Sequence, residues 1–403
     1  MQNLKIGVIK EGKVPPDKRV PLSPKQCGEI NAQDGVEVFV QKSDIRKFSD
    51  DLYAAEGLPV VDSVADCDVL IGVKEVPENQ LIPNKKYLFF SHTYKEQSYN
   101  RDLLKVILEK NIQLIDWEVI TNSRGQRLIA FCRYAGIVGC YNGFLGYGLK
   151  SGRFKLKRAH ECEDRAEMEG QLSLVNLPNN FKVVLTGAGR VGGGALEIIQ
   201  KMGLKCVSPE AFLTAEFDEP VYTQLGVEHY NKKKDGEAFS KKEFYKHPEK
   251  FESDFMQYAC AADMYIACHY WDSKAPFIFN REETKSADWK IKMVADISCD
   301  IDCAVASTLR PSTIAKPFYG YDPTEETEVD FYNEDAIGVM AVDNLPCELP
   351  KDASVDFGEM FIQYVLEPLK GNDPEDIIWR ASETKGGKLT PHFEYLQAYV
   401  DGH

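Results

Sequence analysis

Three glycines in the middle of the chain have the spacing of a dinucleotide-binding turn. Gly187, Gly189 and Gly192 match G-x-G-x-x-G, between an apolar run at 181–185 and a helix-like segment that starts at Ala195. The first glycine permits a sharp turn, the second lets backbone N–H groups approach a pyrophosphate, and the third lets helix pack on strand. The helix N-terminus adds N–H donors and a positive dipole end. This context favours a nucleotide site over an ordinary tight turn.

A second group of polar side chains follows the predicted strands of the first half of the chain. The group consists of Lys13, Arg19, Lys74, Glu75, His92, Lys95 and Glu118. Because open parallel sheets bind ligands beyond the carboxyl ends of their strands, we expect these side chains at one edge. Each alone is typical of a surface charge, but their shared location favours a site. A chain with a net charge of −15 needs such a cluster of cations to hold an anionic ligand.

The elements that must position these side chains alternate between strand and helix patterns. Apolar runs predict strands at 4–9, 36–40, 68–73, 87–90 and 112–115. Helices are predicted from Ser23-Pro24 to about residue 35, from Ser49 to residue 57, and over 101–110. Such alternation predicts a largely parallel sheet with both faces covered.

The second half repeats the pattern after a helix, rich in small residues, that is predicted to run to about residue 150. Strands are predicted at 181–185, 204–207, 263–268, 292–298 and 337–342, and the polar stretch 211–254 is interpreted as an insertion or elaborated connection. Polar residues again follow the strands, among them His269, Asp300 and Asp343. Two sheets with facing ligand edges would form an interdomain cleft.

Composition excludes several classes of function. With 403 residues, 43% of them hydrophobic, the chain can form two or three domains with full cores. Its net charge of −15 argues against binding to nucleic acid or anionic membranes. We expect no signal peptide and no membrane span, since no apolar run approaches about 20 residues. The eleven cysteines lack C-x-x-C pairs and H-E-x-x-H is absent, so reduced thiols, no metal site and a cytoplasmic location are expected.

Several motifs, taken in order, resemble those of the lysine-forming saccharopine dehydrogenases, including the lysine–2-oxoglutarate reductase half of the bifunctional eukaryotic enzyme. They are Lys13 with Arg19, Gly72-Val73-Lys74-Glu75-Val76-Pro77, Phe90-Ser91-His92, and Leu114-Ile115-Asp116-Trp117-Glu118. Residues 244–250 and 342–350 also look like the reductase half, and the second of these is the most specific because alanine dehydrogenases carry a different version. The likeness runs nearly end to end and includes alanine dehydrogenase and the transhydrogenase nucleotide-binding subunit as relatives.

The resemblance implies an α/β fold of two Rossmann-like domains with parallel sheets and an interdomain cleft. A substrate domain would comprise 1–135 and 346–403, and a dinucleotide-binding domain 136–345. Lys74 and His92 would be the acid–base pair, with Lys13, Arg19, Glu75 and Glu118 binding substrate or tuning that pair. The implied cofactor contacts are Arg127, Phe131, Gly187, Gly189, Arg190, Val191, Gly192, Asp300 and Asp343.

The implied reaction joins the ε-amine of lysine to the ketone of 2-oxoglutarate, and the imine takes a hydride from a nicotinamide to give saccharopine. Lys74 close to Lys13 and Arg19 would have its pKa lowered by like charge, which suits a base, whereas Glu118 would oppose that shift. Arg19 suits a bidentate grip on a substrate carboxylate. The reaction needs no metal.

Cofactor choice and two other functions stay open at this point. The acid that reads the ribose 2′-OH should fall about 20 residues beyond the glycine turn, where Glu210 is the nearby candidate after Ser208-Pro209. Both NAD and NADP are possible, with NAD slightly preferred. The alternatives are alanine dehydrogenase or a related amino-acid dehydrogenase, and a non-enzymatic nucleotide-binding subunit like that of transhydrogenase. The expected partners are an amino acid and a 2-oxo acid, and the oligomeric state is not indicated.

Overall fold

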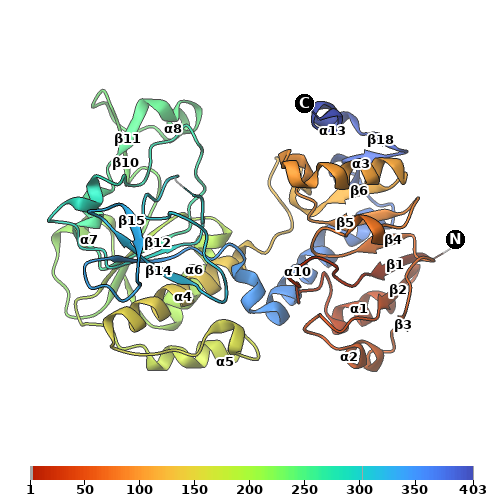
Figure 1. Ribbon diagram of the computed structural model, residues 1–403, viewed down its shortest axis with the longest axis horizontal. Helices are drawn as coiled ribbons and strands as arrows, with labels where there is room; N and C mark the ends of the chain where they lie inside the picture. Colours follow the sequence, from red (N-terminus) through yellow and green to blue (C-terminus); the bar gives the residue numbers. More distant parts are fainter. Residues whose placement is uncertain (1–2, 302, 403) are drawn as a thin grey trace. The chain divides into compact units, whose positions relative to one another are not determined.

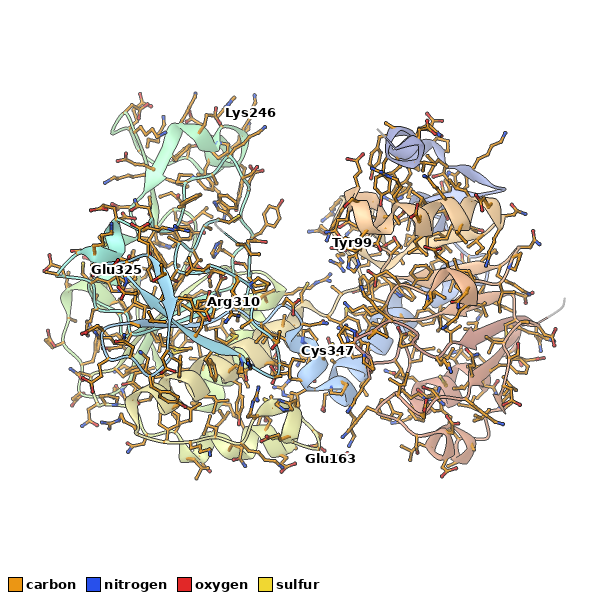
Figure 2. The ribbon with its side chains drawn as sticks, in the orientation of Figure 1. Tyr99, Glu163, Lys246, Arg310, Glu325 and Cys347 are labelled. Atoms are coloured by element: carbon orange, nitrogen blue, oxygen red, sulfur yellow. The ribbon has the colours of Figure 1, made fainter. Side chains whose placement is uncertain are left out.

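A computed structural model describes residues 3–301 and 303–402 (Figure 1). The fold is built on two large sheets, each with its own helices. The chain divides into a first unit, Met1–Phe131 with Pro350–His403, and a second unit, Cys132–Leu349. The boundaries therefore fall after residues 131 and 349, where the sequence predicted 135 and 345. Side chains fill the space between each sheet and its helices (Figure 2).

The first unit contains a six-stranded parallel sheet in the order β3-β2-β1-β4-β5-β6. Its strands are β1 (Leu4–Val8), β2 (Val36–Gln41), β3 (Val60–Val61), β4 (Val69–Ile71), β5 (Lys86–Phe89) and β6 (Gln113–Asp116). The central strand β4 is wholly buried, as expected for a parallel sheet covered on both faces. All strands run in one direction, so the residues that follow them lie at one edge.

Helices from both ends of the sequence cover this sheet. They are α1 (Pro24–Asn31), α2 (Asp50–Ala55), α3 (Arg101–Glu109), α10 (Pro350–Tyr364), α11 (Leu366–Leu369), α12 (Ile377–Arg380) and α13 (Gln397–Asp401), with a hairpin of β17 (Thr384–Lys385) and β18 (Lys388–Leu389). Ser23 and Gln26 form a capping box that starts α1. The blue C-terminal helix α13 lies beside the orange α3 in Figure 1, so the tail belongs to the first unit.

The second unit contains an eight-stranded mixed sheet in the order β15-β14-β16-β13-β12-β7-β9-β8. Its strands are β7 (Lys182–Thr186), β8 (Lys205–Cys206), β9 (Val221–Leu225), β12 (Met264–Ala267), β13 (Met293–Asp296), β14 (Phe318–Asp322), β15 (Thr327–Val329) and β16 (Ile337–Met340). The hairpin β10 (Asn231–Lys233) and β11 (Phe251–Ser253) stands apart. The helices are α4 (Cys132–Ser151), α5 (Arg165–Gly170), α6 (Arg190–Lys201), α7 (Pro209–Thr214), α8 (Lys241–Lys246) and α9 (Met256–Ala259).

The strand beside the glycine strand β7 is not the one that follows the glycine helix in sequence. β9 pairs with β7 in parallel, and β8 pairs with the outer side of β9. Both residues of β8 are exposed, whereas four of the five residues of β9 are buried. The apolar strand therefore takes the interior position and the short polar strand takes the edge. The sequence reasoning missed β9 because it lies inside the stretch interpreted as a polar insertion.

Small residues bring the long helix α4 against the glycine helix α6. A Cβ on Gly136 would overlap the carbonyl oxygen of Val191, and a Cβ on Gly194 would overlap that of Arg133. The small-residue helix predicted from the sequence is thus used for close packing onto α6. This contact fixes the helix whose first turn carries the glycine motif.

The two sheets confirm the predicted α/β fold with two Rossmann-like domains. The prediction of parallel sheets holds for the first unit and is wrong for one edge of the second, where β14 pairs antiparallel with β15 and β16. Within the described residues, no helix is long and apolar enough to cross a membrane. All eleven cysteines lie in the described part of the chain and are free thiols there.

Candidate active site

Glu75 ties two of the predicted site residues together at the carboxyl edge of the first sheet. Its carboxylate oxygens lie 2.6 Å from Lys13 Nζ and 2.7 Å from His92 Nδ1. Burial alone would raise the pKa of Glu75, but hydrogen bonds from His92 and Lys13 lower it to about 2. The ionised carboxylate therefore holds the Nδ1 side of the imidazole and leaves Nε2 as the nitrogen for a ligand.

His92 has an unusual backbone for a residue with a side chain. It lies in the left-handed region, with φ 56° and ψ 9°, between the fully buried Ser91 and Thr93. Its ring stacks on Phe90 with a centroid separation of 6.5 Å. Non-glycine residues in this region cost of order 1 kcal/mol or more and persist only where the surroundings fix them. Such strain is typical of functional side chains.

Lys74 is fixed through its backbone rather than through its ammonium group. The backbone N–H groups of Val73 and Lys74 donate to the two carboxylate oxygens of Glu11, at 2.7 and 2.8 Å. Burial raises the pKa of Glu11 to about 7, although the two N–H donors lower it. The half-buried Lys74 Nζ has no hydrogen bond or ion pair to any residue that the structure describes. Its charge acts on nearby Asp17.

The guanidinium of Arg19 is hydrogen-bonded to a carboxylate of this chain, that of Asp17. Its Nε and Nη2 donate to Asp17 at 3.1 and 2.7 Å, and both side chains are almost fully buried. Burial would raise the pKa of Asp17, but Arg19 lowers it to about 2. The guanidinium lies 4.2 Å from the centroid of Phe131. Part of the bidentate capacity that the sequence assigned to a substrate carboxylate is thus used by Asp17.

Glu118 joins two further cations. Its Oε1 lies 2.9 Å from Lys95 Nζ and 3.5 Å from Arg127 Nη1. Burial would raise the pKa of Glu118, but Lys95 and Arg127 lower it. The expected opposition between Glu118 and Lys74 is therefore replaced by pairing of Glu118 with Lys95 and Arg127.

The ring of Phe90 connects the clusters around Glu75, Arg19 and Glu118. Its ring contacts the imidazole of His92, the guanidinium of Arg127 at 5.5 Å and the ring of Phe131 at 6.0 Å. Phe131 in turn stacks on Phe357 from α10, with centroids 4.5 Å apart. Every residue predicted for the first unit is therefore held in or beside a single patch of charged and aromatic side chains.

Four residues of this patch escaped the sequence reasoning. Asp17 and Glu11 follow the first strand, as Lys13 and Arg19 do, so the strand-end signal contained them. Asp116 ends β6 and accepts hydrogen bonds from Ser91 and Glu118. Glu383 contacts Ser91 from 292 residues further along the chain, a separation that no local pattern reveals.

In the second unit, the glycine motif forms a strand–turn–helix. Gly187 has φ +94°, and a Cβ there would overlap the Cys268 carbonyl. A Cβ on Gly192 would overlap the Gly187 carbonyl oxygen, whereas a Cβ on Gly189 would meet open space. Gly189 is the N-cap of α6 and supplies no side-chain cap, and helix N-termini of this kind attract anions. These features fit the pyrophosphate of a dinucleotide.

The other predicted cofactor residues are spread around this turn. Arg190 is exposed and Val191 half-buried at the start of α6. Glu210 is exposed in α7, which follows the edge strand β8. Asp300 and Asp343 are exposed, and their charges both act on the thiol of Cys299, whose pKa is raised to about 12 mainly by burial. The two aspartates therefore lie near each other.

His269 lies directly beside the turn. It is 7% exposed, its Nδ1 contacts Thr186 Oγ1 at 2.9 Å, and its Nε2 has no partner among the described residues. Burial lowers the pKa of His269 to about 4, so the ring is neutral at pH 7. From the sequence, His269 was assigned no role beyond lining a cleft. Among the described residues, no group of three or more histidine, cysteine or acidic side chains could hold a metal.

Comparison with known proteins supports the family suggested by the motifs. Residues 7–138 match the family model for the N-terminal domain of alanine dehydrogenase/PNT. The mitochondrial alpha-aminoadipic semialdehyde synthase of Mus musculus is 28% identical over 94% of this chain and 46% of its own length. The saccharopine dehydrogenase (NAD(+), L-lysine-forming) of Candida albicans is 26% identical over 92% of this chain and 93% of its own. The chain thus spans about half the length of the mouse relative, and its predicted similarity to saccharopine dehydrogenases is confirmed.

Solved structures show the same fold. An L-alanine dehydrogenase matches with a TM-score of 0.65 at 17% sequence identity, over 99% of both chains. A transhydrogenase from Sinorhizobium meliloti matches with a TM-score of 0.54 at 13% identity, over 96% of this chain and 98% of its own.

Proposed function

We propose that this chain, a relative of the lysine-forming saccharopine dehydrogenases, interconverts saccharopine with L-lysine and 2-oxoglutarate by hydride transfer with NAD. The observation that carries the proposal is that five cations and the Glu75–His92 pair lie together in one patch of the first unit. The five cations are Lys13, Arg19, Lys74, Lys95 and Arg127. They outnumber the carboxylates of Asp17, Glu75, Glu118 and Asp116, and Glu11, whose pKa burial raises to about 7, offsets part of the difference, so the excess of positive charge is small.

The excess charge suits the substrate. Saccharopine carries three carboxylates, and a chain with a net charge of −15 needs a local positive region to hold them. Lys13 and Lys95 are partly exposed, so each can contact a substrate carboxylate while keeping its own partner. The aromatic floor of Phe90, Phe131 and Phe357 offers apolar contact to the carbon chain between the charged groups.

Proton transfer falls to two side chains. His92 is held at Nδ1 by Glu75, so its Nε2 can give a proton to the departing oxygen as lysine and 2-oxoglutarate form the imine. The ammonium of Lys74 has no competing partner among the described residues and can exchange a proton with the substrate nitrogen.

The glycine turn would hold the cofactor, which supplies the hydride for the imine carbon. The N–H groups at the start of α6 would bind the pyrophosphate, and Gly189 offers the space that a side chain would fill. The expected cleft between the two edges and the roles of Asp300 and Asp343 beside the nicotinamide stay predictions.

We further propose that Glu228, rather than Glu210, binds the ribose 2′-OH and favours NAD. In this fold the acid belongs at the carboxyl end of the strand beside the glycine strand, and here that strand is β9. Gln224 Nε2 donates to the Gly187 carbonyl at 2.9 Å, which anchors the end of β9 to the turn. Glu228 follows three residues after Leu225, is exposed, and makes no hydrogen bond or ion pair to the described chain.

Product analysis tests the proposed reaction. The protein is incubated with ¹³C-labelled lysine, 2-oxoglutarate and NADH, and the mixture is separated by mass spectrometry. A labelled product with the mass of saccharopine, formed by the wild-type protein but not by a Lys74→Met/His92→Gln variant, supports the proposal. Oxidation of NADH without that product would contradict it.

A further inference from the structure

Two buried carboxyl groups meet beneath the loop that carries His92. Asp116 ends β6, and Glu383 immediately precedes β17; both side chains are completely buried. The backbone of Glu383 is fixed at both sides, because its N–H donates to Leu114 and its carbonyl accepts from Thr390. Neither carboxyl has an ion-pair partner among the residues that the structure describes.

Two hydroxyl groups bridge the carboxyls. Thr93 Oγ1 lies 2.6 Å from Glu383 Oε2 and 2.6 Å from Ser91 Oγ, and Ser91 Oγ lies 2.5 Å from Asp116 Oδ2. These three short contacts need three protons, but the two hydroxyls supply only two. The third proton must therefore reside on one of the two carboxyl groups.

The surroundings assign that proton to Glu383. Asp116 accepts backbone N–H groups from Ser91 at 2.7 Å and from Glu118 at 2.6 Å, and such donors favour the ionised form. The structure gives Glu383 hydroxyl contacts alone. Burial and the charge of Asp116 raise the pKa of Glu383 to about 8. Burial also raises the pKa of Asp116, although the hydrogen bonds from Ser91 and Glu118 lower it.

We propose that neutral Glu383 is a positioning residue for His92. Glu383 donates its proton to Thr93, Thr93 donates to Ser91, and Ser91 donates to the carboxylate of Asp116. This relay fixes the residues on both sides of His92 and thereby its left-handed backbone. The catalytic consequence rests on the proposed function, whereas the relay itself does not.

Ionisation of Glu383 would break the relay. Two protons would then serve three contacts, and a second negative charge would lie next to Asp116. The other titratable groups whose charges bear on the pair are Glu118 and the phenol of Tyr94, on the side of Asp116, and the phenols of Tyr395 and Tyr399, on the side of Glu383. None of these supplies a positive charge, so the loop at Ser91–Thr93 loses its support as pH rises through about 8.

The first test uses NMR and requires no substrate. The backbone amide resonances of Ser91 and Thr93 are followed from pH 6.5 to 9.5 in the wild-type protein, in Glu383→Gln and in Glu348→Gln, a control at another buried glutamate. The wild type and the control should show a step near pH 8. Glu383→Gln should lack it, because the amide of glutamine donates to Thr93 at every pH. A step that persists in Glu383→Gln, or its absence in the wild type, would overturn the proposal.

Turnover provides the second test. Glu383→Ala should lower kcat by about 10- to 100-fold with little change in KM, because His92 is misplaced. Glu383→Gln should restore kcat and remove the alkaline loss of activity. If the amide step behaves as expected but no variant turns over, the proposed function fails and the relay stands. Equal loss of kcat in the Ala and Gln variants would refute the positioning role.

Discussion

The order of the strands in the second unit leads to a test of cofactor choice at Glu228. β8 lies one strand further from the glycine strand than β9, and neighbouring strands are about 4.8 Å apart. Glu210, which follows β8, therefore starts about 10 Å from the line of β7. Glu228 follows β9, whose last residue Leu225 pairs with Thr186 immediately before the turn. Of these two glutamates, Glu228 is the one that follows the strand beside the glycine strand.

Substituting Glu228 by glutamine replaces a charged acceptor by a neutral one. A hydrogen bond to a charged group contributes about 1.5–3 kcal/mol, so Glu228→Gln should weaken NADH binding by about 10- to 100-fold. The same change removes repulsion of a 2′-phosphate, so NADPH binding should hold or improve. Glu210→Gln, a matched exposed glutamate, should leave both affinities within about twofold.

Fluorescence titration of NADH and NADPH against the three proteins measures these affinities without substrate. The wild type should prefer NADH by at least about tenfold. A wild type that prefers NADPH would refute the reasoning and point to exposed Arg190 as a phosphate contact. The reasoning would also be refuted if the preference for NADH over NADPH were unchanged in Glu228→Gln and lost in Glu210→Gln. If neither dinucleotide binds, the proposed function itself is contradicted.

Three further predictions follow from the two units. Lys74→Met should lower the rate of hydride transfer by about 10²–10⁴-fold in stopped-flow measurements while NADH affinity is retained; an unchanged rate would remove Lys74 from the mechanism. Gly192→Ala should abolish NADH binding in calorimetry, because its Cβ overlaps the Gly187 carbonyl, whereas Gly193→Ala, whose Cβ meets open space, should bind normally. Glu11 and Glu383 have raised pKa values of about 7 and 8, so the stability they contribute is present below pH 4.5 and lost as pH rises. Asp17 and Glu75, with lowered pKa values of about 2, contribute stability above pH 4.5 that is lost as pH falls. Urea unfolding should therefore find the first unit most stable near pH 5 and a few kcal/mol weaker at pH 8; a flat profile would contradict these assignments.

Local patterns were sufficient for much of the fold. The glycine triplet, the apolar runs and the Ser23-Pro24 start of α1 are short-range signals, and the structure has a strand, turn or helix at each. The rule that ligands gather beyond parallel strands brought Lys13, Glu75 and His92 into one set before any contact was known. Their hydrogen bonds in the structure follow from that shared edge.

Long-range competition explains what the sequence could not supply. β9 displaces β8 from the position beside β7 because burial favours its apolar residues, and a window around residues 204–207 does not contain that comparison. One short-range pairing was also missed: Asp17, two residues before Arg19, accepts hydrogen bonds from two nitrogens of the guanidinium that was expected to bind a substrate carboxylate. Glu383 reaches Ser91 across 292 residues, so its role appears only once the tail has folded onto the first sheet.

The central claim is that the first unit assembles a site for lysine and 2-oxoglutarate. Initial rates of NADH and NADPH oxidation should be measured with lysine plus 2-oxoglutarate and, separately, with pyruvate plus ammonia. The account predicts turnover with the first pair and NADH, and little with the second. Turnover with pyruvate and ammonia alone would contradict it.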